Sequence, residues 1–285
     1  MRNTMLAVLM VVAVVAGQIP TDGLVARYDF TGGALTDGSG SGRNLSVYSN
    51  WTLTSDRDMF PNNAYLSTGM TGSAFQGQDE GLPVDNSDRS VCFWIDLAEK
   101  GDSVQQVITW GSLSSGRDTT NSFRIVFRRD TLCIQERGVR MAKYKVTNGD
   151  FPVGGLSQID NIPWANVTLT VKSDTARWYI NEVKKATSKL PVALNTAVAT
   201  NTNLYIGAAG GGRRLIGKLD EVLIYNRALT DAEVLGVFEP QVSVTTPVTS
   251  KRCRPTVNTN HVYLLDGRLM QTSPNRSIAV KYVKR

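Results

Sequence analysis

Short segments in which apolar and polar residues alternate run through most of this sequence, separated by clusters of glycine, asparagine, aspartate and serine. In Ser90–Leu97, for example, Val91, Phe93 and Ile95 alternate with residues that point to the opposite side. Successive side chains of a strand point to opposite faces of its sheet, so this period of two predicts a strand with one buried face. A chain built from such segments buries its apolar residues by stacking sheets.

The same alternation predicts strands at Ser122–Phe127, Thr131–Gln135, Asn166–Lys172, Ala176–Asn181, Asn203–Gly207 and Lys218–Tyr225. Many short strands joined by turns are typical of an all-β fold, and we expect a two-sheet antiparallel jelly-roll sandwich. The best helix signal is at Thr230–Phe238, where Thr230 and Glu233 have the spacing of a capping box.

Composition and charge exclude several classes of protein. Hydrophobic residues make up 41% of the 285 residues and charged residues only 20%, which excludes a disordered chain. The one histidine, His261, leaves no pair of histidines for a zinc site. The formal net charge of +6 comes from residues 251–285, which hold eight basic residues and one acid, whereas segment 18–250 carries −2. We therefore expect no nucleic-acid partner.

The two ends differ from the body. Residues 1–17 contain one arginine, an apolar run and then small residues, as a secretory signal peptide does. The run is shorter than the ~20 apolar residues of a membrane-spanning helix, so we expect no transmembrane segment and an extracellular or cell-surface location. The body is predicted at 18–239, followed by a Thr/Val/Pro linker at 240–252 and a basic tail with a short β appendage at 253–285.

Four stretches of the body resemble the laminin-G-like domains of the concanavalin-A-like superfamily. They are Gly23–Asn44, Ser90–Ile95, Trp164–Ile180 and Leu204–Leu229. The last, with Leu-Asp-Glu-Val-Leu-Ile-Tyr-Asn-Arg-Ala-Leu, is similar to the characteristic ending of these domains. The resemblance implies a jelly roll over nearly the whole body. The chain departs from the family pattern at Thr31, Ala165, Asn166 and Glu182.

Asp37 and Asp220 are candidate calcium ligands. Asp220 is separated from Val222 and Ile224 by an even number of positions, so the alternation places all three side chains on the same side of the strand. This predicts a carboxylate that points inward and needs a cation or hydrogen-bond donors. The glycine-rich loop after Asp37 would add oxygen ligands of the kind calcium prefers. Many members of the resembled family hold a structural Ca²⁺ near such loops. In the alternative, Asp37 forms a turn and both carboxylates accept hydrogen bonds from the chain itself.

Five residues whose side chains the alternation places on the side of their strands away from the core are candidate ligand-binding residues. They are Trp94, Arg177, Tyr179, Tyr205 and Tyr225. Aromatic rings stack on sugars, and arginine donates hydrogen bonds to hydroxyls and acids. In the alternative, these residues cover a sheet face beneath a loop or the tail. Cys92 and Cys133 also have non-core parity and would pair if their strands were neighbours.

Catalysis is not expected. Jelly-roll glucanases need two carboxylates at alternate positions of one strand, and the sequence contains no such run. We therefore expect a secreted, non-catalytic module that binds carbohydrate or another extracellular polymer. An adhesion or structural module that contacts surface or matrix proteins is the alternative, and a glycoside hydrolase is the weakest hypothesis.

The tail suggests a route out of the cell. Residues His261–Arg285 resemble the C-terminal sorting signals of the type IX secretion system, with Val262–Arg268 as the most similar part. The resemblance implies contact with a secretion machinery and attachment at the cell surface. An ordinary pair of strands is the alternative interpretation of the same residues.

Overall fold

The computed structural model describes residues 19–49, 51–69, 74–98, 104–113, 121–147, 150, 164–198, 202–207, 215–238, 262–263 and 269–270. The chain divides into two compact units, Met1–Val242 and Ser243–Arg285. The predicted signal peptide and linker lie outside the described residues, so both stay predictions. No helix in the described ranges is both long and apolar enough to cross a membrane.

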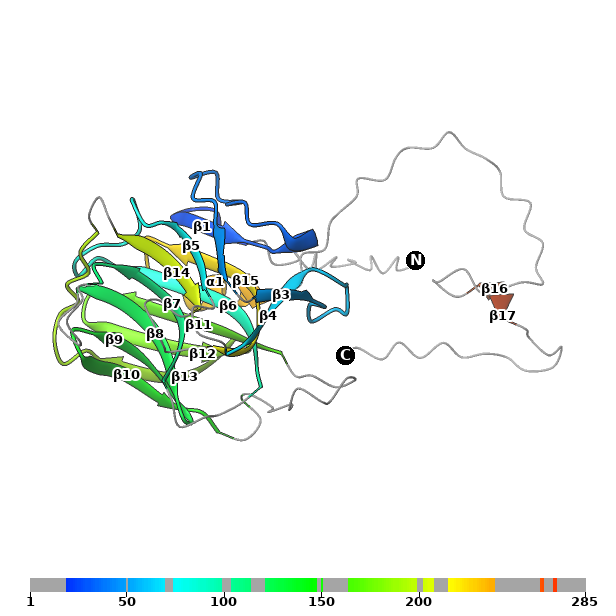
Figure 1. The fold of residues 1–285 in the computed structure, drawn as a ribbon. Helices are drawn as coiled ribbons and strands as arrows, with labels where there is room; N and C mark the ends of the chain where they lie inside the picture. The colour runs from blue at the N-terminus through cyan, green and yellow to red at the C-terminus, as the bar shows by residue number, and fades with distance from the viewer. Residues whose placement is uncertain are drawn as a thin grey trace, which may run out of the picture. The chain divides into compact units, whose positions relative to one another are not determined.

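The first unit is built from two antiparallel sheets that lie one over the other (Figure 1). The eight-stranded sheet has the order β13-β12-β11-β6-β15-β4-β3, and β1 also pairs with β15. Its strands are β1 (Leu24–Tyr28), β3 (Trp51–Thr54), β4 (Ala64–Thr68), β6 (Arg89–Leu97), β11 (Ala165–Lys172), β12 (Thr175–Ile180), β13 (Val183–Lys189) and β15 (Ile216–Tyr225).

The seven-stranded sheet has the order β10-β9-β8-β7-β14-β5-β2. Its strands are β2 (Ser46–Ser49), β5 (Ala74–Gln78), β7 (Val104–Gly111), β8 (Ser122–Arg128), β9 (Thr131–Glu136), β10 (Val139–Lys145) and β14 (Asn203–Gly207). A short 3-10 turn, η1 (Thr31–Gly33), follows β1. Every strand predicted for the body is present with ends within two residues of those expected, and the all-β sandwich is confirmed.

The core lies between the sheets and consists of the residues on the apolar parity of each strand. Val91, Phe93 and Ile95 of β6 face this core, as predicted, together with the fully buried Trp110 and Trp178. Each fully buried aromatic or branched side chain contributes about 1.5–3 kcal/mol of transfer free energy, so the alternation itself accounts for the stacking of the two sheets.

The inward direction predicted for Asp220 is wrong. The pairing of β15 with β6 shifts between Asp220 and Leu223, and Glu221 has a left-handed φ of 45°. This bulge resets the alternation, so that Leu219 and Val222 both enter the core. Asp220 lies opposite Trp94, whose side chain is on the outer side of the sheet. Because a bulge adds one residue to a strand, parity counted across it reverses.

Cys92 and Cys133 do not meet the condition for pairing, because their strands are not neighbours. Cys92 lies on β6 of one sheet and Cys133 on β9 of the other. Both residues have the non-core parity, so their side chains point away from each other on opposite sides of the sandwich. Both thiols are free and buried.

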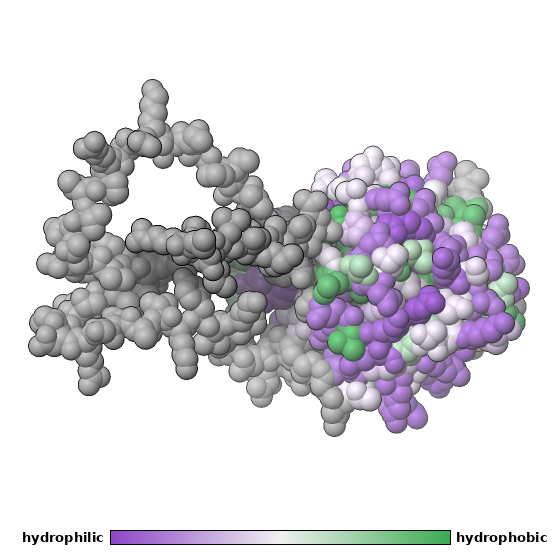
Figure 2. All heavy atoms as spheres, turned by 180° about the vertical axis from the view of Figure 1, so that it is seen from behind, coloured by the Kyte–Doolittle hydropathy of each residue, from purple (hydrophilic) through white to green (hydrophobic). Residues whose placement is uncertain are grey.

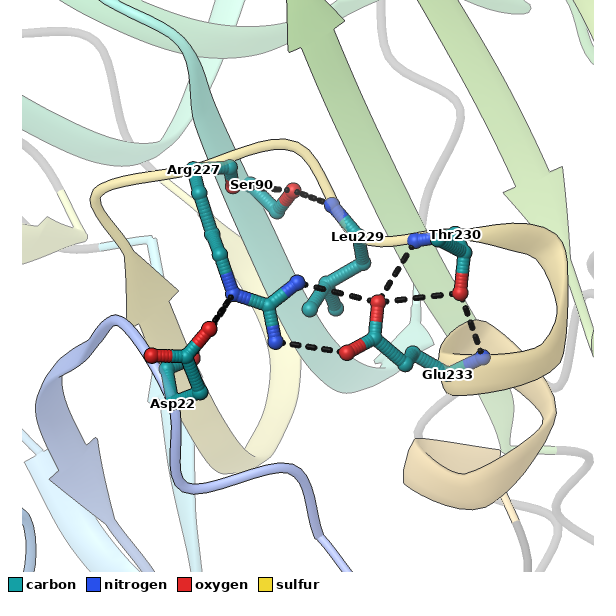
Figure 3. A network of polar contacts seen from close by, with 6 residues as sticks. All are labelled: Asp22, Ser90, Arg227, Leu229, Thr230 and Glu233. Atoms are coloured by element: carbon teal, nitrogen blue, oxygen red, sulfur yellow. Dashed lines mark hydrogen bonds and ion pairs between the residues drawn. The ribbon is translucent and has the colours of Figure 1, made fainter.

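Helix α1 (Asp231–Phe238) follows β15 and begins with the predicted capping box (Figure 3). The backbone N–H of Thr230 donates to Glu233 Oε2 at 2.8 Å, and the backbone N–H of Glu233 donates to Thr230 Oγ1 at 3.3 Å. Arg227 donates two further bonds to the Glu233 carboxylate, at 2.9 and 2.6 Å, and its Nε lies 2.9 Å from Asp22 Oδ2. Ser90 accepts the N–H of Leu229 through Oγ, which ties the turn before the helix to β6.

We expect Glu233→Gln to lower the free energy of unfolding by about 1–2 kcal/mol at pH 7, because the variant keeps the shape but loses the charge that both Arg227 and the helix start require. Thermal melts of the two proteins measure the loss. Leu235→Gln, at an exposed position of the same helix, is the control and should change stability by less than about 0.5 kcal/mol. Equal losses in the two variants would contradict a specific role for the capping box.

In the second unit, β16 (Val262–Tyr263) pairs antiparallel with β17 (Leu269–Met270). Both strands fall within the β appendage that was expected in the tail. The remaining residues of the proposed sorting signal lie outside the described residues. The sorting role therefore stays a prediction.

Candidate ligand-binding face

Two of the five candidate binding residues lie beneath helix α1. Tyr179 and Tyr225 are buried in a second hydrophobic cluster, which also contains Val234 and Val237 of the helix. The hydroxyl of Tyr179 donates to Asp231 Oδ1 at 2.7 Å. Burial raises the pKa of Tyr179 to about 12, and the bond to Asp231 adds to the rise. This arrangement matches the alternative in which the aromatic residues cover a sheet face, and it leaves Tyr225 no exposed surface for a ligand.

Trp94 is also largely covered. The guanidinium of Arg57 lies 4.4 Å from the centre of the Trp94 ring, within range for a cation–π contact. The same guanidinium lies 2.8 Å from Glu221 Oε2 and 3.7 Å from Asp220 Oδ2. Arg177, on the outer side of β12, keeps part of its surface exposed. On the outer side of the eight-stranded sheet, helix α1 thus covers Tyr179 and Tyr225, and Arg57 covers Trp94.

Asp37 organises its own loop. Its Oδ1 accepts the backbone N–H groups of Arg27 and Ser39 at 3.0 and 2.9 Å, and its Oδ2 accepts that of Arg43 at 3.0 Å. Burial opposes ionisation, but these hydrogen bonds together lower the pKa of Asp37 below its usual value. These contacts match the alternative in which Asp37 forms a turn and accepts hydrogen bonds from the chain itself.

Asp37 and Asp220, the two candidate calcium ligands, both have partners within the protein. Asp37 and Asp220 have different partners, and a cation at Asp220 would meet the charge of Arg57. Within the described ranges, no group of three or more His, Cys, Asp or Glu side chains is placed to hold a metal ion. Shared binding of calcium by Asp37 and Asp220 stays a prediction, and its test is given in the Discussion.

Tyr205 lies on the other sheet, in a continuous polar row that crosses the outer side of all seven strands. Cα partners across the sheet define the row, in the order Arg140, Gln135, Arg124, Thr109, Tyr205, Gln76 and Ser46. Each of these residues has at least one core residue, such as Ile125 or Ile206, next to it along the chain, so the row faces away from the core. We call this outer side of the seven-stranded sheet the polar face.

Two features indicate that the polar face can accept a ligand. Thr109 Oγ1 and Gln135 Oε1 are buried and form no hydrogen bond in the described structure. Unsatisfied buried polar atoms are costly, and a bound group with hydroxyls would supply partners. Tyr205, the Cα partner of Thr109, is partly exposed. No outward position on the described strands of this sheet carries an aspartate or a glutamate.

Sequence reasoning found only Tyr205 of this row. The row depends on strand order, and β5, β7, β14 and β8 are joined by long-range pairings that no local pattern reveals. The alternation in Ser122–Phe127 places Arg124 on the side opposite Phe123 and Ile125, but it gives no information on the neighbours of Arg124 across the sheet.

Solved structures with the same architecture include three bacterial binding domains. The binding domain of Paraclostridial mosquitocidal protein 1 is 20% identical with a TM-score of 0.56, and the match covers 76% of this chain and 52% of that domain. The ligand-binding domain of botulinum neurotoxin serotype D, solved with N-acetylneuraminic acid, is 15% identical with a TM-score of 0.56, covering 76% and 51%. The chain therefore spans about half the length of these toxin domains.

Domain 4 of AbnA, an extracellular arabinanase of family GH43 from Geobacillus stearothermophilus, was solved with arabinotriose. It is 18% identical with a TM-score of 0.53, and the match covers 76% of this chain and 98% of that domain. At these identities the structures share the fold alone. No curated protein matches the chain at a significant level. Residues 68–235, more than half of the chain, match the Laminin_G_3 family, described as the concanavalin A-like lectin/glucanases superfamily, and the chain belongs to this family.

Proposed function

We propose that this protein is a secreted, non-catalytic module that binds carbohydrate on the polar face. The observation that carries the proposal is the row in which a partly exposed aromatic ring, Tyr205, lies beside Thr109, whose buried hydroxyl lacks a partner, and in line with Gln135, whose buried amide oxygen also lacks one. Sugars present apolar C–H faces and hydroxyls, so a ring flanked by amide and hydroxyl groups matches both parts of the ligand. Arabinotriose bound to the nearly fully matched arabinanase domain supports the same ligand class.

The absence of outward carboxylates on the described strands of the polar face supports binding without hydrolysis. Glycoside hydrolysis uses two carboxylates on either side of the scissile bond. The outward positions of β8 and β9 carry Arg124, Val126, Cys133 and Gln135 instead. A ligand on this face would meet no general acid from these strands.

Adhesion to a protein is the second candidate function, and one observation favours it. Met59 and Phe60, in the loop between β3 and β4, are 67% and 61% exposed, and Leu53 of β3 is 43% exposed. Asp56 holds this loop by accepting the N–H groups of Asp58 and Phe60. However, the side of the body seen in Figure 2 is mainly hydrophilic, and its hydrophobic residues form small separate groups. Large contiguous apolar patches are the usual mark of protein interfaces.

We expect Tyr205→Ala to weaken glycan binding by about tenfold, because stacking of an aromatic ring contributes about 0.5–1.5 kcal/mol beyond the area it buries. A glycan array followed by calorimetry on the best ligand measures the change. Tyr205→Phe keeps the ring and should bind within about threefold of wild type.

Phe60→Ala removes a more exposed aromatic ring, from the loop between β3 and β4, and is the control. It should leave glycan binding unchanged. If glycans do not bind and Phe60→Ala instead abolishes binding to an extracellular matrix protein, the adhesion alternative replaces the carbohydrate proposal.

A further inference from the structure

Three basic side chains without acidic partners gather at one end of the polar face. Arg128 of β8 and Arg140 and Lys143 of β10 are exposed, and none of the ion pairs in the described structure includes them. All three lie close enough to Cys133 to affect its thiol. Burial raises the pKa of Cys133 to about 11, and the charges of Arg140, Lys143 and Arg128 oppose that rise.

Several basic residues elsewhere in the first unit are neutralised by acidic partners within the protein. Arg27 pairs with Asp29 at 2.7 Å, and Lys185 pairs with Asp150 at 2.9 Å. Lys145, at the rim of the polar face, pairs with Asp130 at 3.3 Å. Like charges that stand together without counter-charges repel one another, so the group of Arg128, Arg140 and Lys143 costs stability unless an external anion binds there.

The group is continuous with the candidate binding row. Arg140 is the first residue of that row, and its Cα partner, Gln135, lies beside Arg124. From β10 to β14 the row crosses four spaces between neighbouring strands, a span of about 19 Å at about 4.8 Å for each space. This length accommodates several sugar units, with the basic group at one end and Tyr205 near the other.

We propose that the glycan bound on the polar face is anionic, a polysaccharide with carboxylate or sulfate groups that contact Arg128, Arg140 and Lys143. This inference rests on the proposed function and specifies its ligand class. Arginine forks match planar carboxylates and sulfates, and lysine supplies an additional positive charge. A polysaccharide fits better than a nucleic acid because segment 18–250 is weakly acidic as a whole, and these three basic residues occupy one end of one sheet.

The experiment compares pairs of polymers that differ only in charge, dextran sulfate against dextran and polygalacturonate against its methyl ester. Binding of the full chain is measured between 50 and 500 mM NaCl, conditions chosen because salt screens charge contacts over about 10 Å at ~0.1 M. We expect the anionic polymer of at least one pair to bind at least tenfold more tightly than its neutral counterpart. Arg140→Gln/Lys143→Gln should remove most of that difference.

Lys184→Gln/Lys189→Gln, on β13 of the other sheet, changes the net charge equally and is the matched control. It should retain the preference for the anionic polymer, and because the basic tail is identical in both variants, its contribution cancels. Neutral and anionic polymers that bind equally in both variants would overturn the anionic ligand but leave the carbohydrate proposal standing.

Failure of every polymer to bind would overturn both proposals. Duplex DNA and phosphatidylserine vesicles serve as non-glycan polyanions. If they bind as tightly as the anionic polysaccharide, and Tyr205→Ala weakens none of these interactions, the basic group attracts polyanions in general and the glycan assignment is wrong.

Discussion

Replacement of Arg89 by methionine is expected to lower the free energy of unfolding by about 3–5 kcal/mol, the usual cost of removing one partner from a buried ionic network. For a domain of this size, each 1 kcal/mol shifts the melting temperature by about 2–4 °C, so we expect a decrease on the order of 10 °C. Arg89 is fully buried at the start of β6. Thermal melts at pH 7 measure the effect.

The expected loss follows from the partners that Arg89 would leave behind. Its Nη1 donates to Thr196 Oγ1 at 2.9 Å, and that hydroxyl donates in turn to the buried carboxylate of Glu136 at 2.9 Å. Its Nη2 and Nε donate to the backbone carbonyls of Asp85 and Ser87 at 2.7 and 3.0 Å. Methionine fills part of the volume but satisfies none of these acceptors, and Glu136 keeps a buried charge without its counter-charge.

Two further variants test whether the network is the cause. Glu136→Gln added to Arg89→Met removes the unpaired charge, so the double variant should lose less than the two single losses combined. Arg137→Met removes a neighbouring exposed arginine, which has one 3.4 Å contact with the Ala193 carbonyl, and should cost less than about 0.5 kcal/mol. A similar small loss for Arg89→Met would contradict a structural role for the network.

The sandwich was predictable because its determinants are local. Alternation in β6, β8 and β11 placed strands and their core faces correctly, since a period of two needs only the residues of one strand. The capping box of Thr230 and Glu233 was predictable for the same reason. Chemistry carried by neighbouring residues is visible in a sequence.

The binding face was not predictable because it depends on which strands are neighbours. Trp94 and Tyr205 share an outward parity, but they lie on opposite sheets of the sandwich. The bulge at Glu221 reversed the direction of Asp220, and nothing in the residue types on either side of it indicates a left-handed backbone. Counting alternate positions assigns side chains to the two faces of a strand correctly only up to the first bulge. It gives no information on which of the two sheets the strand joins.

The second large effect concerns Asp220, and we expect Asp220→Asn to raise the melting temperature at pH 8. The Asp220 side chain is almost completely buried beside Glu221. Burial, followed by the charge of Glu221, raises the pKa of Asp220 to about 8, while Arg57 opposes the rise. The unfolded chain has a pKa of about 3.9 at this residue. Between these two values the folded protein holds a proton that the unfolded chain releases.

Stability therefore decreases as the pH rises from about 4 to about 8, because ionisation increasingly favours the unfolded chain. Asparagine has nearly the same shape and no charge, so the variant escapes this decrease. We expect a gain on the order of 2–3 kcal/mol at pH 8, since each pKa unit corresponds to about 1.4 kcal/mol and Arg57 retains Glu221 as a partner. At pH 4.5 the two proteins should melt at nearly the same temperature.

Glu233→Gln provides a control of opposite sign. Its contacts with Arg227 lower the pKa of Glu233 to about 2, so the stability that Glu233 provides is present at neutral pH. That stability is lost as the pH falls from about 4 towards 2. The deficit of this variant should therefore shrink in acid, whereas the gain from Asp220→Asn should grow with rising pH. Melts from pH 2 to 8.5 follow both differences.

The same melts, repeated in calcium chloride and in EDTA, distinguish a neutral Asp220 from a calcium ligand. A bound ion adds stability in proportion to the logarithm of its concentration over Kd, about 2.7 kcal/mol at a hundredfold excess. If calcium stabilises the wild type and Asp220→Asn removes that effect, Asp220 is ionised and ligates the metal. If the melts are independent of calcium and the variant is more stable at pH 8, Asp220 is a buried neutral acid whose proton lessens the electrostatic cost of placing it beside Glu221.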